Sequence, residues 1–294
     1  MASVVQVLCT PHDPLLPGVA AGGSAAPEPL RRSIAHFAEL RTRLAAARPD
    51  VLVVVSGDHF NQWFYDNMPT FLIGKAVRAR GPFPHEQELF GIGSYDTALE
   101  GDIARHLLRG GFERGIDFSY SDDFLLDHGF TVPLSFLRPE QDLPVVPIFT
   151  NVMAPPVATG RRFYDLGAAI VEMVEAHPAD LRVAIIASGH LSNAIGNPAM
   201  ARFQTEPETE WDKRVWGQIT AGDTESLIKE TTYESLAAIG SGTPGFLDFL
   251  FALGAVGGVT PDYAEKVAST FAPPTGFLAW GDHASAPASE VVAP

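Results

Sequence analysis

The chain has 294 residues, of which 46% are hydrophobic and 19% are charged, a composition that is ordinary for a soluble globular protein. Its 35 acidic and 20 basic residues give a formal net charge of −15 at pH 7. A nucleic acid or an anionic membrane surface is therefore not expected as a partner, because both need a basic face.

The cysteine content and the lengths of the apolar runs exclude further classes of protein. Cys9 is the single cysteine, so an internal disulfide and a thiolate zinc site are both excluded. The first residues lack a basic segment followed by an apolar run, and no stretch approaches the roughly 18–20 apolar residues of a membrane span. We expect a cytoplasmic protein.

Strand and helix patterns alternate along the chain. Residues 3–9 and 51–56 are short apolar runs, and the β-branched run at 51–56 is typical of a strand buried on both faces of a parallel sheet. Between them, residues 28–48 have apolar side chains at helical spacing. Further strands are predicted at 144–150 and 182–188, and further helices at 96–110, 161–177 and 243–256.

This order predicts a single α/β domain, with a mixed, mainly parallel central sheet and helices on both faces. We place the domain at residues 1–283 and a flexible C-terminal tail at residues 284–294, which are rich in Ala, Ser, Pro and Val.

Three of the predicted strands are each followed closely by a histidine, namely His12, His59 and His190. Ligands of open α/β sheets bind at the carboxyl ends of the strands. His128, between an apolar stretch and the turn-forming Gly129, is the fourth candidate. Imidazole is the commonest metal ligand and titrates near neutral pH, so these four histidines indicate a pocket for metal binding or proton transfer. The remaining histidines are interpreted as structural or solvent-facing, with His85 also a candidate to line the pocket: His36, His85, His106, His177 and His283.

The segment Gly57–Phe71, GDHFNQWFYDNMPTF, resembles a long and compositionally unusual stretch of the 2,3-dihydroxyphenylpropionate 1,2-dioxygenases. These enzymes lie in the class III extradiol dioxygenase superfamily, with the protocatechuate 4,5-dioxygenase β-subunit. The D-H-G-F sequence that begins at Asp127 and the dipeptide Gly189-His190 resemble further landmarks of the family. The resemblance runs from about residue 5 to about residue 258.

The resemblance implies Fe(II)-dependent ring cleavage of a catechol-type aromatic acid by O2, in an enzyme that is expected to be a homo-oligomer. His12 and His59 match the two histidines that hold the iron together with a glutamate, an arrangement that leaves positions open for the catecholate and for O2. His128 and His190 match the acid–base pair, and Asp127 would orient or charge-tune a neighbouring group.

Residues around these histidines are candidates for substrate contact. Aromatic side chains after His59 would wall a ring-shaped substrate, and two asparagines would hydrogen-bond the substrate or a ligand histidine. The set comprises Phe60, Asn61, Trp63, Tyr65 and Asn193.

The iron-binding glutamate of the family has no counterpart here, because its position falls on Gly245. One interpretation is that Asp248, one helical turn on, supplies the carboxylate, with Glu234 and Asp13 as weaker candidates. A second is that His12 and His59 hold a metal with water or substrate in the gap. Thr243-Pro244 would form an N-cap and first helical residue just before this position.

A third interpretation is that no redox metal binds and that the reaction does not involve O2. The same pocket would then serve a redox-neutral hydrolase, lyase or decarboxylase that acts on a phenolic substrate. A non-catalytic paralogous subunit is the remaining alternative, and the presence of all four histidines argues against it.

Overall fold

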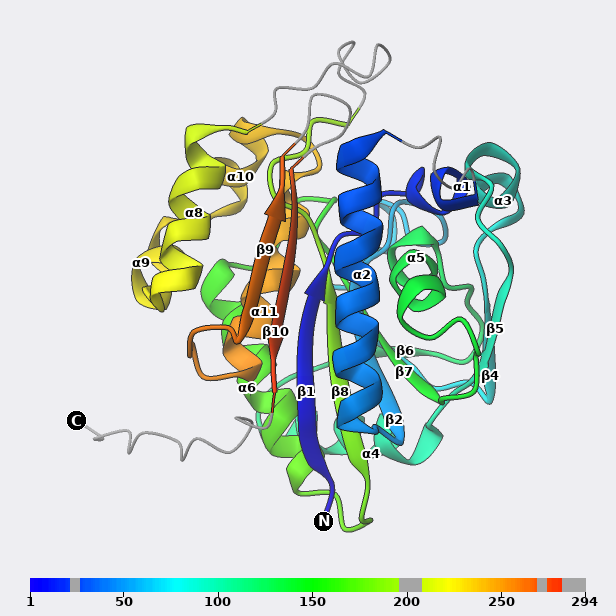
Figure 1. Ribbon diagram of the computed structural model, residues 1–294. Coiled ribbons are helices and arrows are strands. Elements are labelled where there is room, and N and C mark those ends of the chain that lie inside the picture. The colour runs from blue at the N-terminus through cyan, green and yellow to red at the C-terminus, as the bar shows by residue number, and fades with distance from the viewer. Residues whose placement is uncertain (22–26, 196–207, 269–273, 282–294) are drawn as a thin grey trace, which may run out of the picture.

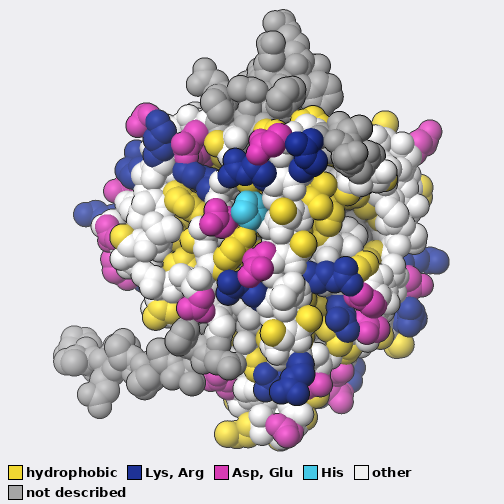
Figure 2. All heavy atoms as spheres, viewed as in Figure 1, with side chains coloured by type: hydrophobic (Ala, Val, Ile, Leu, Met, Phe, Trp, Pro, Cys, Tyr) yellow, Lys and Arg dark blue, Asp and Glu magenta, His cyan; other side chains and the backbone are white. Residues whose placement is uncertain are grey.

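The computed structural model describes residues 1–21, 27–195, 208–268 and 274–281 (Figure 1). The tail predicted at residues 284–294 and His283 lie outside these ranges. Within the described residues, no helix combines the length and the apolar character needed to cross a membrane. On the face shown in Figure 2, acidic and basic side chains are interspersed and no broad basic area is seen.

The strands form one large mixed sheet and a separate two-stranded ribbon. The large sheet has the order β6-β3-β7-β2-β8-β1-β10-β9, and β4 pairs with β5 in the ribbon. The strands are β1 (Ser3–Thr10), β2 (Val51–Gly57), β3 (Phe71–Gly74), β4 (Arg78–Gly81), β5 (Tyr95–Ala98), β6 (Ser119–Ser121), β7 (Val145–Thr150), β8 (Arg182–Ser188), β9 (Tyr263–Val267) and β10 (Thr275–Trp280).

Helices lie on both faces of this sheet (Figure 1). They are α1 (Leu16–Ala21), α2 (Glu28–Ala47), α3 (Pro84–Phe90), α4 (Gly101–Glu113), α5 (His128–Leu137), α6 (Gly160–Glu175), α8 (Glu210–Ala221), α9 (Thr224–Glu230), α10 (Tyr233–Ile239), the 3-10 turn η2 (Thr243–Phe246) and α11 (Leu247–Ala255).

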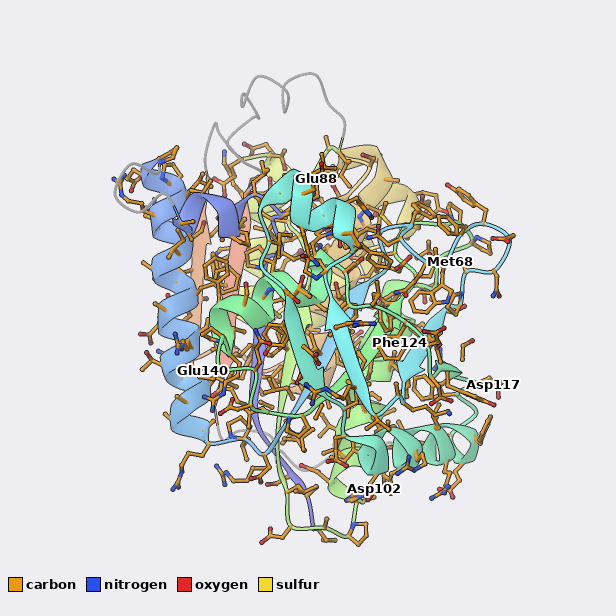
Figure 3. The ribbon with its side chains drawn as sticks, turned by 90° about the vertical axis from the view of Figure 1, so that its right-hand side faces the viewer. Met68, Glu88, Asp102, Asp117, Phe124 and Glu140 are labelled. Carbon is orange, nitrogen blue, oxygen red and sulfur yellow. The ribbon has the colours of Figure 1, made fainter. Side chains whose placement is uncertain are left out.

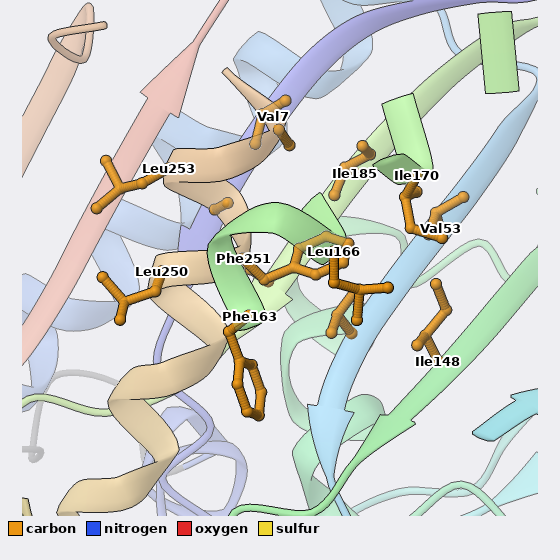
Figure 4. Close-up of a cluster of buried hydrophobic side chains, with 14 of the residues drawn as sticks. Val7, Val53, Ile148, Phe163, Leu166, Ile170, Ile185, Leu250, Phe251 and Leu253 are labelled. Carbon is orange, nitrogen blue, oxygen red and sulfur yellow. The ribbon is translucent and has the colours of Figure 1, made fainter. Parts of the chain in front are cut away.

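The central strands β7, β2, β8 and β1 run parallel, whereas β10 and β9 add antiparallel pairs at one edge. Successive side chains of β2 enter different cores, because a strand alternates its faces. Val53 packs with α6 and α11 (Figure 4), and Leu52 packs in a second cluster with α2 and α5. The predicted mixed, mainly parallel sheet with helices on both faces is confirmed.

Two predicted helices differ from the structure. The helix expected at residues 96–110 begins only at Gly101, where the Glu100 side chain accepts the backbone N–H of Asp102. The residues before it form β5, in which the Thr97 hydroxyl donates to the Leu143 carbonyl. Tertiary pairing with β4 therefore overrides the helical periodicity there.

The helix expected at residues 243–256 is divided into η2 and α11. Thr243 was predicted as its N-cap, and this is wrong. Thr243 is the first residue of η2, and its hydroxyl accepts the backbone N–H of Asn193 at 3.1 Å instead of capping its own turn.

Helices α6 and α11 pack closely because glycines lie at their contact. A Cβ on Gly167 would lie 1.9 Å from the carbonyl oxygen of Phe251, and a Cβ on Gly254 would lie 1.9 Å from that of Tyr164. Neither contact can be relieved by moving a side chain, since both partners are backbone atoms.

We therefore expect Gly167→Ala to lower the free energy of unfolding by about 2–3 kcal/mol through overpacking. The matched control is Gly217→Ala in α8, where an added Cβ meets nothing within 4 Å. That substitution should raise stability by about 0.5–1 kcal/mol through helix propensity. Urea unfolding of both variants checks the pair, and equal stability of the two would contradict this close backbone packing.

Candidate active site

Four imidazoles meet at the carboxyl ends of the central strands. The ring of His12 lies 4.9 Å from that of His59, 5.6 Å from that of His128 and 4.0 Å from that of His190, measured between centroids. The rings of His59 and His128 are 4.1 Å apart. Figure 3 shows the same end of the molecule from the side, with Glu88 of α3 toward it and Asp102 of α4 at the opposite end.

Two of these imidazoles are held by buried carboxylates. His59 Nδ1 lies 2.9 Å from Asp127 Oδ2, and His128 Nδ1 lies 2.5 Å from Glu86 Oε1. Both histidine side chains are 13% exposed, whereas those of Asp127 and Glu86 are 0% and 2% exposed. Each imidazole thus joins a buried carboxylate to the histidine cluster.

His12 is held by a hydroxyl. Its Nδ1 lies 2.8 Å from Ser188 Oγ, and this hydroxyl donates its own hydrogen to the carbonyl of Gly129 at 2.7 Å. A serine has one hydroxyl hydrogen, so His12 must donate from Nδ1 to Ser188. Its Nε2 then carries a lone pair, and this buried atom has no hydrogen-bond partner among the described residues.

Asp127 has a structural task as well, because it is the N-cap of α5. Its Oδ1 accepts the backbone N–H of Gly129 at 2.9 Å, while its Oδ2 accepts the backbone N–H of His59 at 3.0 Å. Gly129 is required beside it, since a Cβ there would lie 2.4 Å from Ser56 Oγ. The D-H-G-F sequence therefore combines a helix cap, a pocket imidazole and a close approach to β2.

The charge state of the cluster follows from burial and from these pairs. Burial alone would raise the pKa of Asp127, but the charge and hydrogen bonds of His59 lower it to about 2. Burial lowers the pKa of His59, and Asp127 more than compensates, so the net shift is upward. Burial and the neighbouring imidazoles lower the pKa of His12, and they lower that of His190 to about 3. His12 and His190 are thus neutral at physiological pH.

Glu86 is a site residue that the sequence reasoning missed. The residue as a whole is 1% exposed. Its Oε1 accepts hydrogen bonds from Nδ1 and the backbone N–H of His128 and from Asn61 Nδ2. Its Oε2 accepts the backbone N–H of Phe83 at the start of α3. The residue lies 42 positions before His128, and no spacing in the sequence connects the two.

The described residues offer two clusters with the composition of a metal site. The potential ligand atoms of His12, His59 and His190 all lie within 4.8 Å of one another, as do those of His59, Asp127 and His128. In the second cluster, Asp127 already accepts a hydrogen bond from His59. The first cluster supplies three imidazoles, a set of donors that suits a first-row divalent ion.

The structure does not bring Asp248 into either cluster. Asp248 is fully buried in α11, where its Oδ1 accepts the Thr150 hydroxyl at 2.8 Å. Burial raises the pKa of its carboxyl group to about 7, although the hydrogen bond from Thr150 acts in the opposite direction. The weaker candidates Asp13 and Glu234 are likewise absent from both clusters.

The raised pKa of Asp248 predicts a pH-dependent stability. Its folded-state pKa of about 7 lies above the unfolded value of about 3.9, so the folded protein loses stability as pH rises between these values. Asp248→Asn keeps the shape of the neutral carboxyl group and removes this loss. From pH 5 to pH 8, the variant should gain roughly 2–3 kcal/mol relative to the parent.

Urea unfolding of the metal-free protein at the two pH values checks this. A variant that is less stable than the parent at pH 8 would instead show that the ionised carboxylate takes part in a favourable interaction.

The candidate substrate residues differ in how they are packed and how far they are exposed. Trp63 packs edge-on against Phe149 of the core, with centroids 4.6 Å apart, whereas Tyr65 is 75% exposed. The ring of Phe60 lies 5.2 Å from that of Tyr65. Asn61 donates to Glu86 and so supports a carboxylate of the site.

Asn193 carries an acceptor without a partner among the residues that the structure describes, because its Oδ1 is buried and forms no hydrogen bond with them. This oxygen is a group that Asn193 could offer to a ligand.

The mixed, mainly parallel sheet and the four imidazoles at the carboxyl ends of its central strands define an α/β protein with a histidine cluster as its candidate active site. The family model described as the catalytic LigB subunit of aromatic ring-opening dioxygenase matches residues 6–276. The chain belongs to this family.

Curated relatives carry names that agree with the family. A 2,3-dihydroxyphenylpropionate/2,3-dihydroxicinnamic acid 1,2-dioxygenase of Photorhabdus laumondii is 33% identical over 208 residues, which are 70% of this chain and 61% of the relative. Another of the same name, from Mycolicibacterium gilvum, is 31% identical over 247 residues, 82% of this chain and 71% of the relative. The chain thus spans about three fifths of the first of these relatives.

The crystal structure of an uncharacterized protein from Escherichia coli K12 has the same fold. The two structures superpose with a TM-score of 0.55 at 14% sequence identity. The match covers 93% of this chain and 99% of the other.

Proposed function

We propose that this protein is an Fe(II)-dependent extradiol dioxygenase that opens the ring of a catechol-type aromatic acid. The observation that carries the proposal is the cluster of four imidazoles, three of which are oriented by Asp127, Glu86 or Ser188. The names of the relatives, which refer to dihydroxyphenylpropionate and dihydroxycinnamic acid, support the substrate class.

The donor set fits a metal ion. His12 Nε2 is a buried atom without a partner, and such an atom is costly unless it gains one. His12 and His59 would hold Fe(II) through Nε2, since the Nδ1 atoms of both are already engaged. When bound, Fe(II) would accept both catechol oxygens and O2 at its open positions.

His128 is proposed as the acid–base group. Glu86 Oε1 accepts hydrogen bonds from the backbone N–H of His128 and from Asn61, which marks it as an ionised acceptor. His128 therefore donates its Nδ1–H to the same oxygen, and its Nε2 is left for the substrate. Nε2 can take a proton from a phenol and return it to the ring-opened product. Glu86 would stabilise the imidazolium while the proton is held, and Asp127 would orient His59.

His190 lies beside His12 in the cluster, with ring centroids 4.0 Å apart. Phe60, Trp63, Tyr65 and Asn193 stay proposed as residues near the substrate. The cytoplasmic location and the homo-oligomeric state also stay predictions from the sequence.

Oxygen uptake tests the proposal. The protein is first loaded with Fe(II) under nitrogen, and uptake is measured after air is admitted. On addition of air, 2,3-dihydroxyphenylpropionate should be consumed with one O2 per molecule and should yield a yellow ring-opened product. The matched control is 3-(3-hydroxyphenyl)propionate, which lacks the second hydroxyl group and should not react. Turnover of either compound under nitrogen would favour the redox-neutral alternative, and no turnover in any condition would favour a non-catalytic subunit.

A further inference from the structure

Gly245, the position that matches the iron-binding glutamate of the family, lies directly against His190. A Cβ on Gly245 would lie 3.0 Å from His190 Cδ2 and 3.7 Å from the His190 backbone nitrogen. The backbones of the two segments also approach closely, since a Cβ on Gly189 would lie 2.4 Å from the carbonyl oxygen of Gly245. The imidazole of His190 thus borders the space that a side chain at position 245 would enter.

The same imidazole is within reach of the two proposed ligands. A ring nitrogen of His190 lies within 4.8 Å of ligand atoms of both His12 and His59. The ring centroids of His12 and His190 are 4.0 Å apart, closer than His12 lies to His59 or His128. Asp248, the carboxylate considered as a replacement, is bonded to Thr150 and is absent from the group.

The hydrogen bonds leave the nitrogen lone pairs of this group available. Ser188 engages Nδ1 of His12, and Asp127 engages Nδ1 of His59. None of the described residues forms a hydrogen bond with the imidazole ring of His190. Three imidazoles therefore converge with nitrogens that can serve as metal ligands.

We propose that His190 is the third metal ligand of this protein and takes the place of the missing glutamate. The inference rests on the metal site of the proposed function. The metal face would consist of three imidazoles, so it would carry one negative charge fewer than a face of two histidines and a carboxylate. Such a face suits a first-row divalent ion. Of the two imidazoles in the expected acid–base pair, His128 would then carry out proton transfer alone.

Binding of Co(II) to the metal-free protein tests the inference without any turnover. We expect one bound Co(II) with visible absorption, and His190→Gly should weaken Co(II) affinity by about 100-fold or more, since loss of an outer-shell partner already costs about 10–100-fold. Gly245→Glu alone should not strengthen binding, because the new side chain meets the His190 ring. The double variant His190→Gly, Gly245→Glu should recover most of the affinity by restoring the carboxylate.

Two controls accompany these variants. His106→Gln should bind Co(II) like the parent protein, because His106 lies in α4 with its Nε2 hydrogen-bonded to the Met173 carbonyl. Far-ultraviolet circular dichroism and thermal melts establish that each variant is folded. If His190→Gly does not fold, pulsed EPR of Cu(II) bound to the parent protein counts the coordinated imidazoles, where three support the inference and two overturn it.

Parent-like Co(II) affinity in folded His190→Gly would overturn the inference and return His190 to the acid–base pair. The absence of Co(II) binding by the parent would also overturn it. A protein that binds Co(II) through His190 but opens no catechol would contradict only the proposed function.

Discussion

Replacing His128 with glutamine is expected to lower kcat for catechol cleavage by about 10²–10⁴-fold, the range typical of losing a general acid–base group. The imidazole is oriented by the buried Glu86, and 13% of its side chain is exposed. Glutamine keeps a polar side chain of similar length and cannot carry the proton. Oxygen uptake at saturating Fe(II) and substrate measures the effect.

Glu86→Gln is the matched variant, because it retains an oxygen that can accept the Nδ1–H of His128 but removes the negative charge. We expect a smaller fall, about 10-fold in kcat, consistent with the loss of one supporting partner. A His128→Gln variant with a kcat near that of the parent would contradict the acid–base role of His128.

The second large effect is expected for His12→Ala. His12 contacts the rings of the three other pocket imidazoles, and its Nε2 is buried without a partner. Removing it should weaken metal affinity by about 100-fold or more, so the purified variant should retain almost no metal and almost no oxygen uptake. Metal analysis after dialysis, together with activity at increasing Fe(II), measures both losses.

His106→Gln is the control for this loss, because His106 lies in α4 with its Nε2 hydrogen-bonded to the Met173 carbonyl. Metal content and activity should match those of the parent. If His12→Ala keeps a full equivalent of metal at parent affinity, the metal is bound elsewhere.

The central strands and the clustering of the four histidines could be predicted from the sequence. The run at residues 51–56 is buried on both faces, as expected, and β2 spans Val51–Gly57. Each parallel strand has a defined carboxyl end, so histidines that follow β1, β2 and β8 come together once the strand order is known. His128 joins them because Asp127 caps α5 beside His59.

The residues that support the imidazoles could not be predicted in this way. Glu86 lies 42 residues from His128, and Ser188 lies 176 residues from His12. Such contacts depend on tertiary packing and leave no periodicity in the sequence. The same limit applies to Gly245, where the sequence indicates a missing carboxylate but only the fold shows the imidazole of His190 beside it.

The most direct test of the account is the fate of ¹⁸O2 in a single turnover with 2,3-dihydroxyphenylpropionate. Mass spectrometry of the ring-opened product should show both oxygen atoms of one O2 molecule in the product, with allowance for exchange of an aldehyde or ketone oxygen with water. A product that contains no oxygen from O2, or a product formed at the same rate under nitrogen, would contradict the assignment of this histidine site to ring-opening dioxygenation.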